Sequence, residues 1–261
     1  MDEFFKSASW ANALLFPCPK LRTPPSQKTA PNYHTLTHKG TFMEYLSFPP
    51  TGKSTSTPKA LFFMHGNGSD IMQEQHSLRE LVQLLENTNI HIFCVEYPGY
   101  ASTQSIVQCT ESLLLRQYPK SVEAVLCKHG LKWENTTLVG HSIGTGVVCN
   151  MALLFPIAHL VLMSAYTSIR DVLAARMGRI LSLALLFNRF ESIKRIPDIS
   201  CPITLLHGKQ DALIPYQHSI ELARAATHHD RVKIVLLKNA DHNNISWSQV
   251  YDYALKDKLT E

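Results

Sequence analysis

The sequence lacks several features that mark secreted and membrane-spanning proteins. No stretch reaches the roughly 20 consecutive apolar residues that a membrane span needs. The N-terminus carries Asp2 and Glu3 instead of the basic cluster that opens a secretory signal. The six cysteines are scattered and form no C-x-x-C pair, so we expect small buried hydrophobic residues and not a disulfide framework. These absences predict an intracellular, cytoplasmic protein.

Patterns for metal and nucleotide binding are also missing. There is no H-E-x-x-H sequence and no Cys/His array, and the glycines match neither a P-loop nor a dinucleotide fingerprint. We therefore expect no metal and no cofactor. The net charge is only +4, and residues 1–60 carry all of this excess, with seven Lys and Arg against three acidic residues. A nucleic-acid-binding surface is not indicated.

From residue 60 onward, short apolar runs alternate with helical stretches. The expected strands are 60–65, 90–97, 136–140, 160–164, 203–207 and 232–237. The expected helices are 72–86, 106–129 (with a kink or restart at Pro119), 144–155, 219–226 and 246–258. Continuous apolar strands that alternate with helices predict an α/β fold, with a mostly parallel central sheet covered by helices on both faces.

A serine stands between two glycines at one of these strand-to-helix junctions. The pattern is Gly140-His141-Ser142-Ile143-Gly144, between the expected strand 136–140 and the expected helix 144–155. Small neighbours permit the strained backbone of a nucleophile elbow, which lifts the serine Oγ above the sheet. The pattern by itself also suits a glycine-rich turn in which the serine caps a helix. Its place in the chain favours Ser142 as a nucleophile.

An acid and a histidine follow Ser142 in the chain, each just after an expected strand. Asp211 follows the strand 203–207, and His242 follows the strand 232–237. In parallel α/β sheets the site lies at the carboxyl ends of the strands, and the order Ser, Asp, His is that of α/β hydrolases. Asp241 is adjacent to His242, and adjacent side chains rarely point at each other; Asp198 precedes its strand and lies at the wrong end of the sheet. Asp211 is therefore the expected acid. His242 is then the general base.

The loop after the first apolar run supplies the expected oxyanion donors. It reads His65-Gly66-Asn67-Gly68-Ser69-Asp70, and its glycines let the backbone pass close to a substrate carbonyl. We expect the backbone N–H groups of Asn67 and Ile143 to form the oxyanion hole. We interpret His65 as a structural residue that holds the loop.

Five motifs together resemble one family. They are His-Gly-Asn-x-x-Asp at 65–70, Glu-Tyr-Pro-Gly-Tyr at 96–100, Gly-His-Ser-Ile-Gly-Thr at 140–145, His-Gly-x-x-Asp at 207–211 and Asp-His-Asn at 241–243. The chain resembles the α/β-hydrolase domain-containing 17 and 13 proteins and related serine hydrolases over about residues 40–255. This resemblance implies an α/β-hydrolase fold and a membrane-associated serine hydrolase with Ser142, Asp211 and His242 as its triad. For the 17 group it implies the removal of palmitate from protein cysteines.

Two segments extend beyond this core pattern. Residues 166–197 form a long apolar and cationic insert, interpreted as a short helical lid whose Leu181, Leu185, Leu186 and Phe187 line an acyl channel. Residues 1–40 are an N-terminal arm, ahead of a hydrolase domain over 41–261. Its apolar face and basic residues suit either contact with an anionic membrane or packing on the domain, and Cys18 is a candidate for lipidation.

The expected function is cleavage of acyl esters or thioesters by a serine hydrolase, with long-chain substrates such as S-palmitoylated protein cysteines. The expected partners are therefore an acylated protein or a lipid, and a membrane surface at the periphery. A lysophospholipase or monoacylglycerol-type esterase is one alternative, because the elbow chemistry is shared. A binding protein without catalysis on the same fold is a second alternative.

Overall fold

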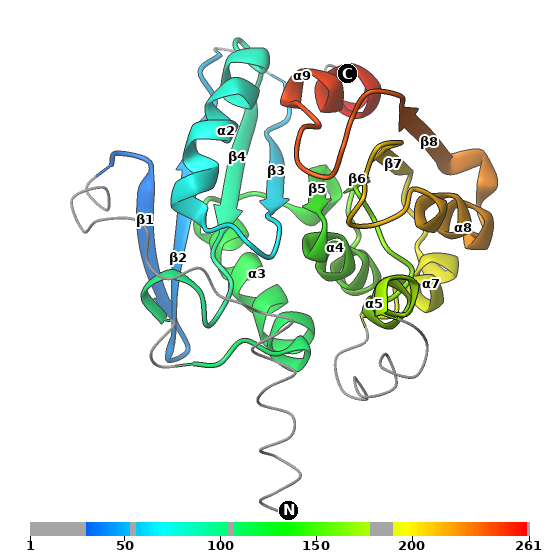
Figure 1. Cartoon of the computed structure of the whole chain (residues 1–261). Helices are drawn as coiled ribbons and strands as arrows, with labels where there is room; N and C mark the ends of the chain where they lie inside the picture. Colours follow the sequence, from blue (N-terminus) through cyan, green and yellow to red (C-terminus); the bar gives the residue numbers. More distant parts are fainter. Residues whose placement is uncertain (1–29, 53–55, 104–106, 178–189, 260–261) are drawn as a thin grey trace, which may run out of the picture.

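The computed structural model describes residues 30–52, 56–103, 107–177 and 190–259 (Figure 1). These residues form an eight-stranded sheet in the order β1-β2-β4-β3-β5-β6-β7-β8. The strands are β1 Tyr33–His38, β2 Thr41–Phe48, β3 Lys59–Met64, β4 Ile90–Val95, β5 Thr136–His141, β6 His159–Met163, β7 Ile203–Gly208 and β8 Val232–Leu237. The six strands expected after residue 60 are all present within a few residues of their expected bounds.

The sheet is mostly parallel, as predicted. Strand β1 pairs antiparallel with β2, and β2 pairs antiparallel with β4. All remaining neighbours, from β4 through β8, pair in parallel. The carboxyl ends of β3, β5, β6, β7 and β8 therefore meet at one edge, and the loops that leave them are brought together there.

Helices cover both faces of this sheet (Figure 1). One core cluster joins the sheet to α2 Ile71–Leu84, α9 Trp247–Val250 and α10 Lys256–Leu259. The other joins it to α3 Tyr118–Lys128, α4 Ile143–Leu154, α5 Ile169–Met177, α7 Ser192–Arg195 and α8 Gln217–Ala225. Neighbouring strand residues alternate between the two clusters, as Phe62 and Phe63 do, because successive side chains of a strand point to opposite faces.

The expected helix 106–129 differs from the observed one at its start. Helical structure begins at Glu111, and residues 107–110 are irregular. Thr110 explains this start, because its Oγ1 accepts a hydrogen bond from Leu113 N at 3.2 Å, as a capping residue does. The irregularity predicted at Pro119 is present as a π-helical turn over Leu113–Gln117, directly before α3. Proline lacks an N–H and disturbs the regular hydrogen bonding of the preceding turn.

The sheet begins inside the segment assigned above to the N-terminal arm, because β1 covers Tyr33–His38 and pairs with β2. Residues 1–29 of the arm, including Cys18, lie outside the described residues. So do the expected lid residues Leu181, Leu185, Leu186 and Phe187. None of the helices in the described ranges is long and apolar enough to cross a membrane.

The cysteine prediction is confirmed at three positions and wrong at one. Cys94, Cys109 and Cys149 are buried free thiols, whereas Cys127 is exposed and Cys201 is half-buried. Cys127 lies near the end of α3, beside the exposed Lys128, where the helix turns its surface to solvent.

Candidate active site

Ser142 lies at a sharp turn between β5 and α4. Its backbone angles are φ 53° and ψ −119°, in a region that L-residues rarely adopt. The flanking glycines make this turn possible. A β-carbon at Gly144 would lie 2.2 Å from the Met64 carbonyl oxygen, and one at Gly140 would lie 2.7 Å from the Gly144 carbonyl carbon. The junction therefore has the geometry of the predicted nucleophile elbow.

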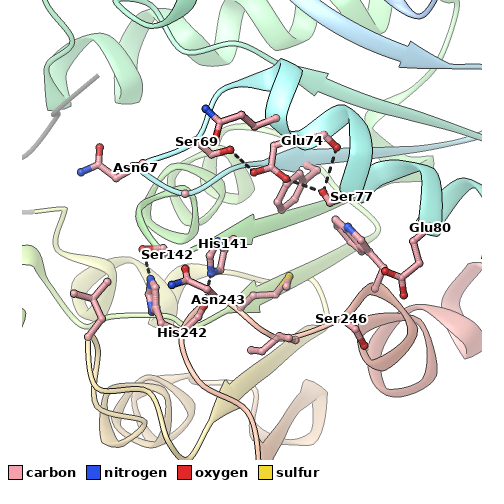
Figure 2. A pocket seen from close by; sticks show the side chains of 18 residues that line it. Asn67, Ser69, Glu74, Ser77, Glu80, His141, Ser142, His242, Asn243 and Ser246 are labelled. Atoms are coloured by element: carbon pink, nitrogen blue, oxygen red, sulfur yellow. Dashed lines mark hydrogen bonds between the residues drawn. The ribbon is translucent and has the colours of Figure 1, made fainter. Parts of the chain in front are cut away.

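The structure brings Ser142, His242 and Asp211 into one hydrogen-bonded chain. His242 Nε2 lies 3.1 Å from Ser142 Oγ, and His242 Nδ1 lies 2.8 Å from Asp211 Oδ2 (Figure 2 shows the first of these contacts). The carboxylate can only accept, so Nδ1 carries the proton and Nε2 presents its lone pair to the serine hydroxyl. Asp241, the rival acid, is exposed and accepts from the backbone N–H groups of residues 243 and 244.

Asp211 is held as a carboxylate. Burial alone would raise its pKa, but hydrogen bonds from His207, His242 and the Ile214 N–H lower the pKa well below its ordinary value. Its Oδ1 accepts from the N–H groups of Leu213 and Ile214 at 2.8 and 2.7 Å. A fixed negative charge behind His242 is what a general base needs to take up a proton.

His141 supports the same histidine from the elbow. Its Nε2 lies 2.9 Å from the main-chain oxygen of His242, and it must donate there because a carbonyl only accepts. Burial and the nearby His242 lower the pKa of His141 to about 4, so its ring is neutral at neutral pH. The sequence pattern alone gives no role for His141.

The two expected oxyanion donors belong to segments that adjoin the serine. Ile143 is the first residue of α4, where backbone N–H groups have no acceptor within the helix. The loop with Asn67 passes close by, because a β-carbon at Gly66 would lie 3.7 Å from Ser142 Cβ. Tyr100 holds Asn67, donating from its hydroxyl to Asn67 Oδ1 at 2.5 Å.

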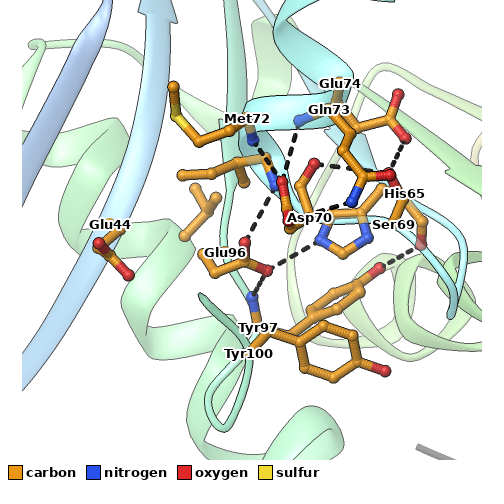
Figure 3. A network of polar contacts seen from close by, with 12 residues as sticks. Glu44, His65, Ser69, Asp70, Met72, Gln73, Glu74, Glu96, Tyr97 and Tyr100 are labelled. Atoms are coloured by element: carbon orange, nitrogen blue, oxygen red, sulfur yellow. Dashed lines mark hydrogen bonds and ion pairs between the residues drawn. The ribbon is translucent and has the colours of Figure 1, made fainter. Parts of the chain in front are cut away.

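A buried ion pair anchors this loop at its base (Figure 3). His65 Nε2 lies 3.0 Å from Glu96 Oε1, and His65 Nδ1 lies 2.8 Å from the Gly66 carbonyl oxygen. Both ring nitrogens face acceptors, so His65 is an imidazolium. Burial acts to lower the pKa of His65, but the charge and hydrogen bond of Glu96 outweigh it and raise the pKa. The structural role predicted for His65 is present in these contacts.

Glu96 and Tyr97 extend this anchor to both ends of the loop. Glu96 Oε2 accepts from Ile71 N at 3.0 Å, where α2 begins, and the Tyr97 hydroxyl donates to the His65 carbonyl at 2.8 Å. Asp70 caps α2 by accepting from Met72 N and Gln73 N. In the sequence, Glu96 and Tyr97 stand out only as part of a motif, because their pairing with the loop depends on how β4 lies beside β3.

A cavity of about 620 Å³ opens over Ser142 and His242 and extends between α2 and the loop before α9 (Figure 2). One part of its wall is apolar: Phe63, Met163, Leu213, Ile245 and Trp247. The other part is polar and includes Asn67, Ser69, Glu74, Ser77, Glu80 and Asn243. Its described lining contains two carboxylates and no Lys or Arg. Among the described residues, no group of three or more His, Cys, Asp or Glu side chains is placed to hold a metal ion.

The described parts of the insert 166–197 pack beside the elbow. The Tyr166 hydroxyl donates to the Ile143 carbonyl at 3.2 Å. A β-carbon at Gly146 of α4 would lie 2.3 Å from that hydroxyl and 2.9 Å from Phe190 Cδ1, so the insert contacts the elbow helix at both of its described ends. The interpretation of this insert as a lid stays a prediction.

Comparisons with known proteins agree with this architecture. A family model described as "alpha/beta hydrolase fold" matches residues 59–179. The chain is 26% identical to human alpha/beta hydrolase domain-containing protein 17B over 88% of this chain and 75% of that protein. It is 26% identical to the mouse 17C protein over 78% of this chain and 61% of that protein.

Solved structures share the fold at lower identity. A 2,6-dihydroxy-pseudo-oxynicotine hydrolase has a TM-score of 0.69 at 16% identity, covering 87% of this chain and 67% of that one. Mouse alpha/beta hydrolase domain-containing protein 10 has a TM-score of 0.62 at 18% identity, covering 87% and 98%. The fold class and the resemblance to the 17 proteins are confirmed. This chain thus has the α/β hydrolase fold and is a homologue of the alpha/beta hydrolase domain-containing 17 proteins.

Proposed function

We propose that the chain is a serine hydrolase that cleaves acyl esters or thioesters through an acyl-enzyme. The observation that carries the proposal is the hydrogen-bonded chain from Ser142 Oγ through His242 to Asp211, at a serine held on a strained elbow. A protein that used this fold only for binding would have no need of these three side chains in this arrangement.

In the proposed reaction, Ser142 Oγ attacks the acyl carbonyl carbon while His242 Nε2 takes the hydroxyl proton. The electron pair of the carbonyl moves to oxygen, and the N–H groups of Asn67 and Ile143 stabilise that oxyanion. Collapse of the intermediate breaks the bond to the leaving alcohol or thiol, which receives the proton from His242. Water then attacks the acyl-enzyme, with His242 again as base, and releases the acid.

The proposed substrates carry a long acyl chain, and S-palmitoylated protein cysteines are the leading class. The resemblance to the 17 proteins and the apolar wall of the cavity support this choice, because each buried CH₂ contributes about 0.8 kcal/mol to binding.

Within the alternative lipid class, the cavity favours an uncharged headgroup. The hydroxyls of Ser69 and Ser77 donate to Glu74, so their oxygens can accept from the hydroxyls of a monoacylglycerol, and the amide of Asn243 can bind the same hydroxyls. A lysophospholipid phosphate would instead face Glu74 and Glu80 across a cavity whose described lining has no cation. A monoacylglycerol esterase is therefore the second candidate function.

Labelling with a fluorophosphonate probe tests the catalytic proposal without knowledge of the substrate. We expect wild type to be labelled, Ser142→Ala to be unlabelled, and His242→Ala and Asp211→Asn to react far more slowly. Ser164→Ala is the matched control, because Ser164 also has a positive φ after a strand of the same sheet. Labelling of Ser142→Ala at the wild-type level would overturn the proposal.

A substrate panel tests the acyl and headgroup classes. We expect a palmitoyl-cysteine peptide to be hydrolysed with a higher kcat/KM than its acetyl counterpart. A monoacylglycerol should be hydrolysed faster than a lysophosphatidylglycerol of the same chain length. Preference for the acetyl peptide would contradict a long-chain substrate, and preference for the anionic lipid would contradict the role given to the two carboxylates.

A further inference from the structure

Asp211 has a second histidine partner that the proposed mechanism does not use. His207, at the end of β7, is fully buried, and its Nε2 lies 3.2 Å from Asp211 Oδ2. This is the same oxygen that accepts from His242 Nδ1 at 2.8 Å. The acid of the triad is therefore contacted by two imidazoles, one at the end of β7 and one from the loop after β8.

The surroundings of His207 determine which of its nitrogens carries a proton. Its Nε2 also lies 2.9 Å from the Ile214 carbonyl oxygen. Both neighbours of Nε2 only accept, so Nε2 must be a donor shared between them. On the other side of the ring, Nδ1 lies 2.7 Å from the hydroxyl oxygen of Ser219, a buried residue of α8.

The Nε2–H of His207 also helps to hold the loop of residues 211–214 around the Asp211 carboxylate. Ile214 donates its N–H to Asp211 Oδ1 and accepts from His207 through its carbonyl oxygen. His207 thus fixes both the oxygen that faces His242 and the backbone that holds the other oxygen. The carboxylate thus accepts hydrogen bonds from Leu213, Ile214 and His242, and His207 Nε2 contacts it at 3.2 Å.

We propose that His207 is a positioning residue, which orients Asp211 toward His242 through its Nε2–H. The inference rests on the proposed function, since it concerns how the acid of that triad is held. A carboxylate that rotates by a few tens of degrees would lose the linear hydrogen bond to His242 Nδ1, so its orientation needs a second anchor on the same oxygen.

The test compares three variants at this buried cluster. His207→Phe keeps a ring and removes the donor, and His207→Gln restores a donor near the Nε2 position. Ser219→Ala perturbs the same cluster from the Nδ1 side and leaves the Nε2–H in place. Thermal unfolding of each variant shows whether it is folded at the assay temperature.

We expect His207→Phe to lower kcat by about 10- to 100-fold with little change in KM, the effect of losing a hydrogen bond to a charged group. His207→Gln should recover most of this loss, and Ser219→Ala should lose no more than about threefold, because the contact to Asp211 is intact. A folded His207→Phe variant with wild-type kcat would overturn the proposal. Equal losses in the Phe and Gln variants would also overturn it, by assigning His207 to packing alone.

The pH profile of kcat/KM separates positioning from packing. Its acid limb reports protonation of the general base in the free enzyme. In His207→Phe the misoriented Asp211 carboxylate stabilises the protonated form of His242 less, so we expect the acid limb to move to lower pH, and to return in His207→Gln. His218 of α8 and Asp171 of α5, which face this region through Thr167, are present in every variant and affect all profiles equally. An unmoved acid limb in an impaired His207→Phe variant would contradict positioning.

A proton NMR spectrum gives a readout that needs no substrate. The His242 Nδ1 proton in its hydrogen bond to Asp211 should give a downfield resonance that is retained in His207→Gln and shifted or lost in folded His207→Phe. This pattern in a protein that no fluorophosphonate labels would overturn the proposed function and support positioning. A resonance unchanged in His207→Phe would overturn positioning whatever the labelling shows.

Discussion

At the residue scale, the elbow depends on two glycines, which have no side chain. Gly140 and Gly144 pack so closely against neighbouring backbone that neither position has room for a β-carbon. The contact at Gly144 is with the backbone of Met64, which belongs to a central strand and cannot move aside. The strain at Ser142 is thus maintained by packing that the surrounding sheet enforces.

The first prediction concerns Gly144→Ala. The new methyl group would meet the Met64 carbonyl oxygen at 2.2 Å, so we expect the free energy of unfolding to fall by about 1–3 kcal/mol, as overpacking does. The probe should also label Ser142 more slowly, since the elbow must shift. Urea unfolding and labelling rates measure these effects. Gly68→Ala is the control, because a β-carbon there has no neighbour within 4 Å, and an equal loss of stability in it would contradict the packing argument.

The second prediction concerns Asp211→Asn. Asparagine offers an amide group where the carboxylate oxygen accepts from His242, so it favours the wrong imidazole tautomer and removes the negative charge. We expect kcat to fall by about 10⁴-fold. Steady-state kinetics on the best substrate of the panel measure the loss. Asp241→Asn, at the exposed neighbour of His242, should stay within about threefold of wild type, and a large loss there would move the acid role to Asp241.

At the element scale, the loop 65–70 is stretched between β3 and α2 and is anchored from β4. Glu96 contacts His65 at the start of the loop and Ile71 just after its end. The loop therefore owes its position to a strand that is distant in the sequence and adjacent in the sheet. A loop held at both ends keeps the Asn67 N–H in a fixed place, and an oxyanion hole is effective only when its donors are preorganised.

The third prediction uses the pH dependence of this anchor. The folded pKa of His65 is raised above 6.5, so its stabilising contribution is complete below the unfolded value and is lost as the pH rises through the folded value. In Glu96→Gln the partner charge is gone. We expect the variant to be less stable at pH 6 by about 2–4 kcal/mol, and the difference from wild type to narrow toward pH 9.

Urea unfolding at several pH values measures this difference. Glu86→Gln is the control, because Glu86 is exposed at the end of α2 and should leave the stability and its pH slope unchanged. If the free energies of unfolding of wild type and Glu96→Gln differ by the same amount at pH 6 and at pH 9, the ion pair with His65 is not the source of the lost stability.

The fourth prediction concerns the helix that follows the loop. Asp70 Oδ1 accepts from the N–H groups of Met72 and Gln73 and so caps α2. We expect Asp70→Ala to lower the free energy of unfolding by about 0.5–2 kcal/mol and Asp70→Asn to lose less, because asparagine is also a good cap. Thermal unfolding of the two variants checks this order, and an alanine variant as stable as wild type would contradict it.

At the scale of the whole molecule, the excess positive charge lies in residues 1–60. Residues 1–60 hold seven of the basic residues against three acidic ones, and the remaining chain is neutral. A hydrolase of long-chain acyl groups must meet its substrate at a lipid surface. Basic and apolar residues in one segment would hold the enzyme there, although a single weak signal anchors poorly.

The fifth prediction is that deletion of residues 1–20 removes binding to anionic vesicles and leaves fluorophosphonate labelling in solution unchanged. Flotation with phosphatidylserine-containing vesicles measures the binding. The same measurement with neutral vesicles shows how much of that binding is electrostatic. Replacement of Lys6, Lys20 and Arg22 by Gln should weaken binding to anionic vesicles only. Unchanged flotation of the deleted protein would remove the arm as a membrane contact.

The sequence by itself determined the alternating strands and helices, the elbow at Ser142 and the order in which Asp211 and His242 follow. These features depend on local rules: apolar periodicity, the small residues that a tight turn requires, and the position of loops after strands. The fold class could be predicted for the same reason, since continuous apolar strands must be covered on both faces.

Only the tertiary structure decided which distant side chains meet. The pairing of Asp211 with His242, the anchoring of His65 by Glu96 and the hydrogen bond from Tyr100 to Asn67 all join residues from different strand ends. No local sequence pattern encodes these contacts. They depend on the order of the strands in the sheet, which places β4 beside β3 and β7 beside β8. The physical reason is that a parallel sheet gathers the ends of its strands at one edge, and the identity of each neighbour there depends on how the whole chain is wound.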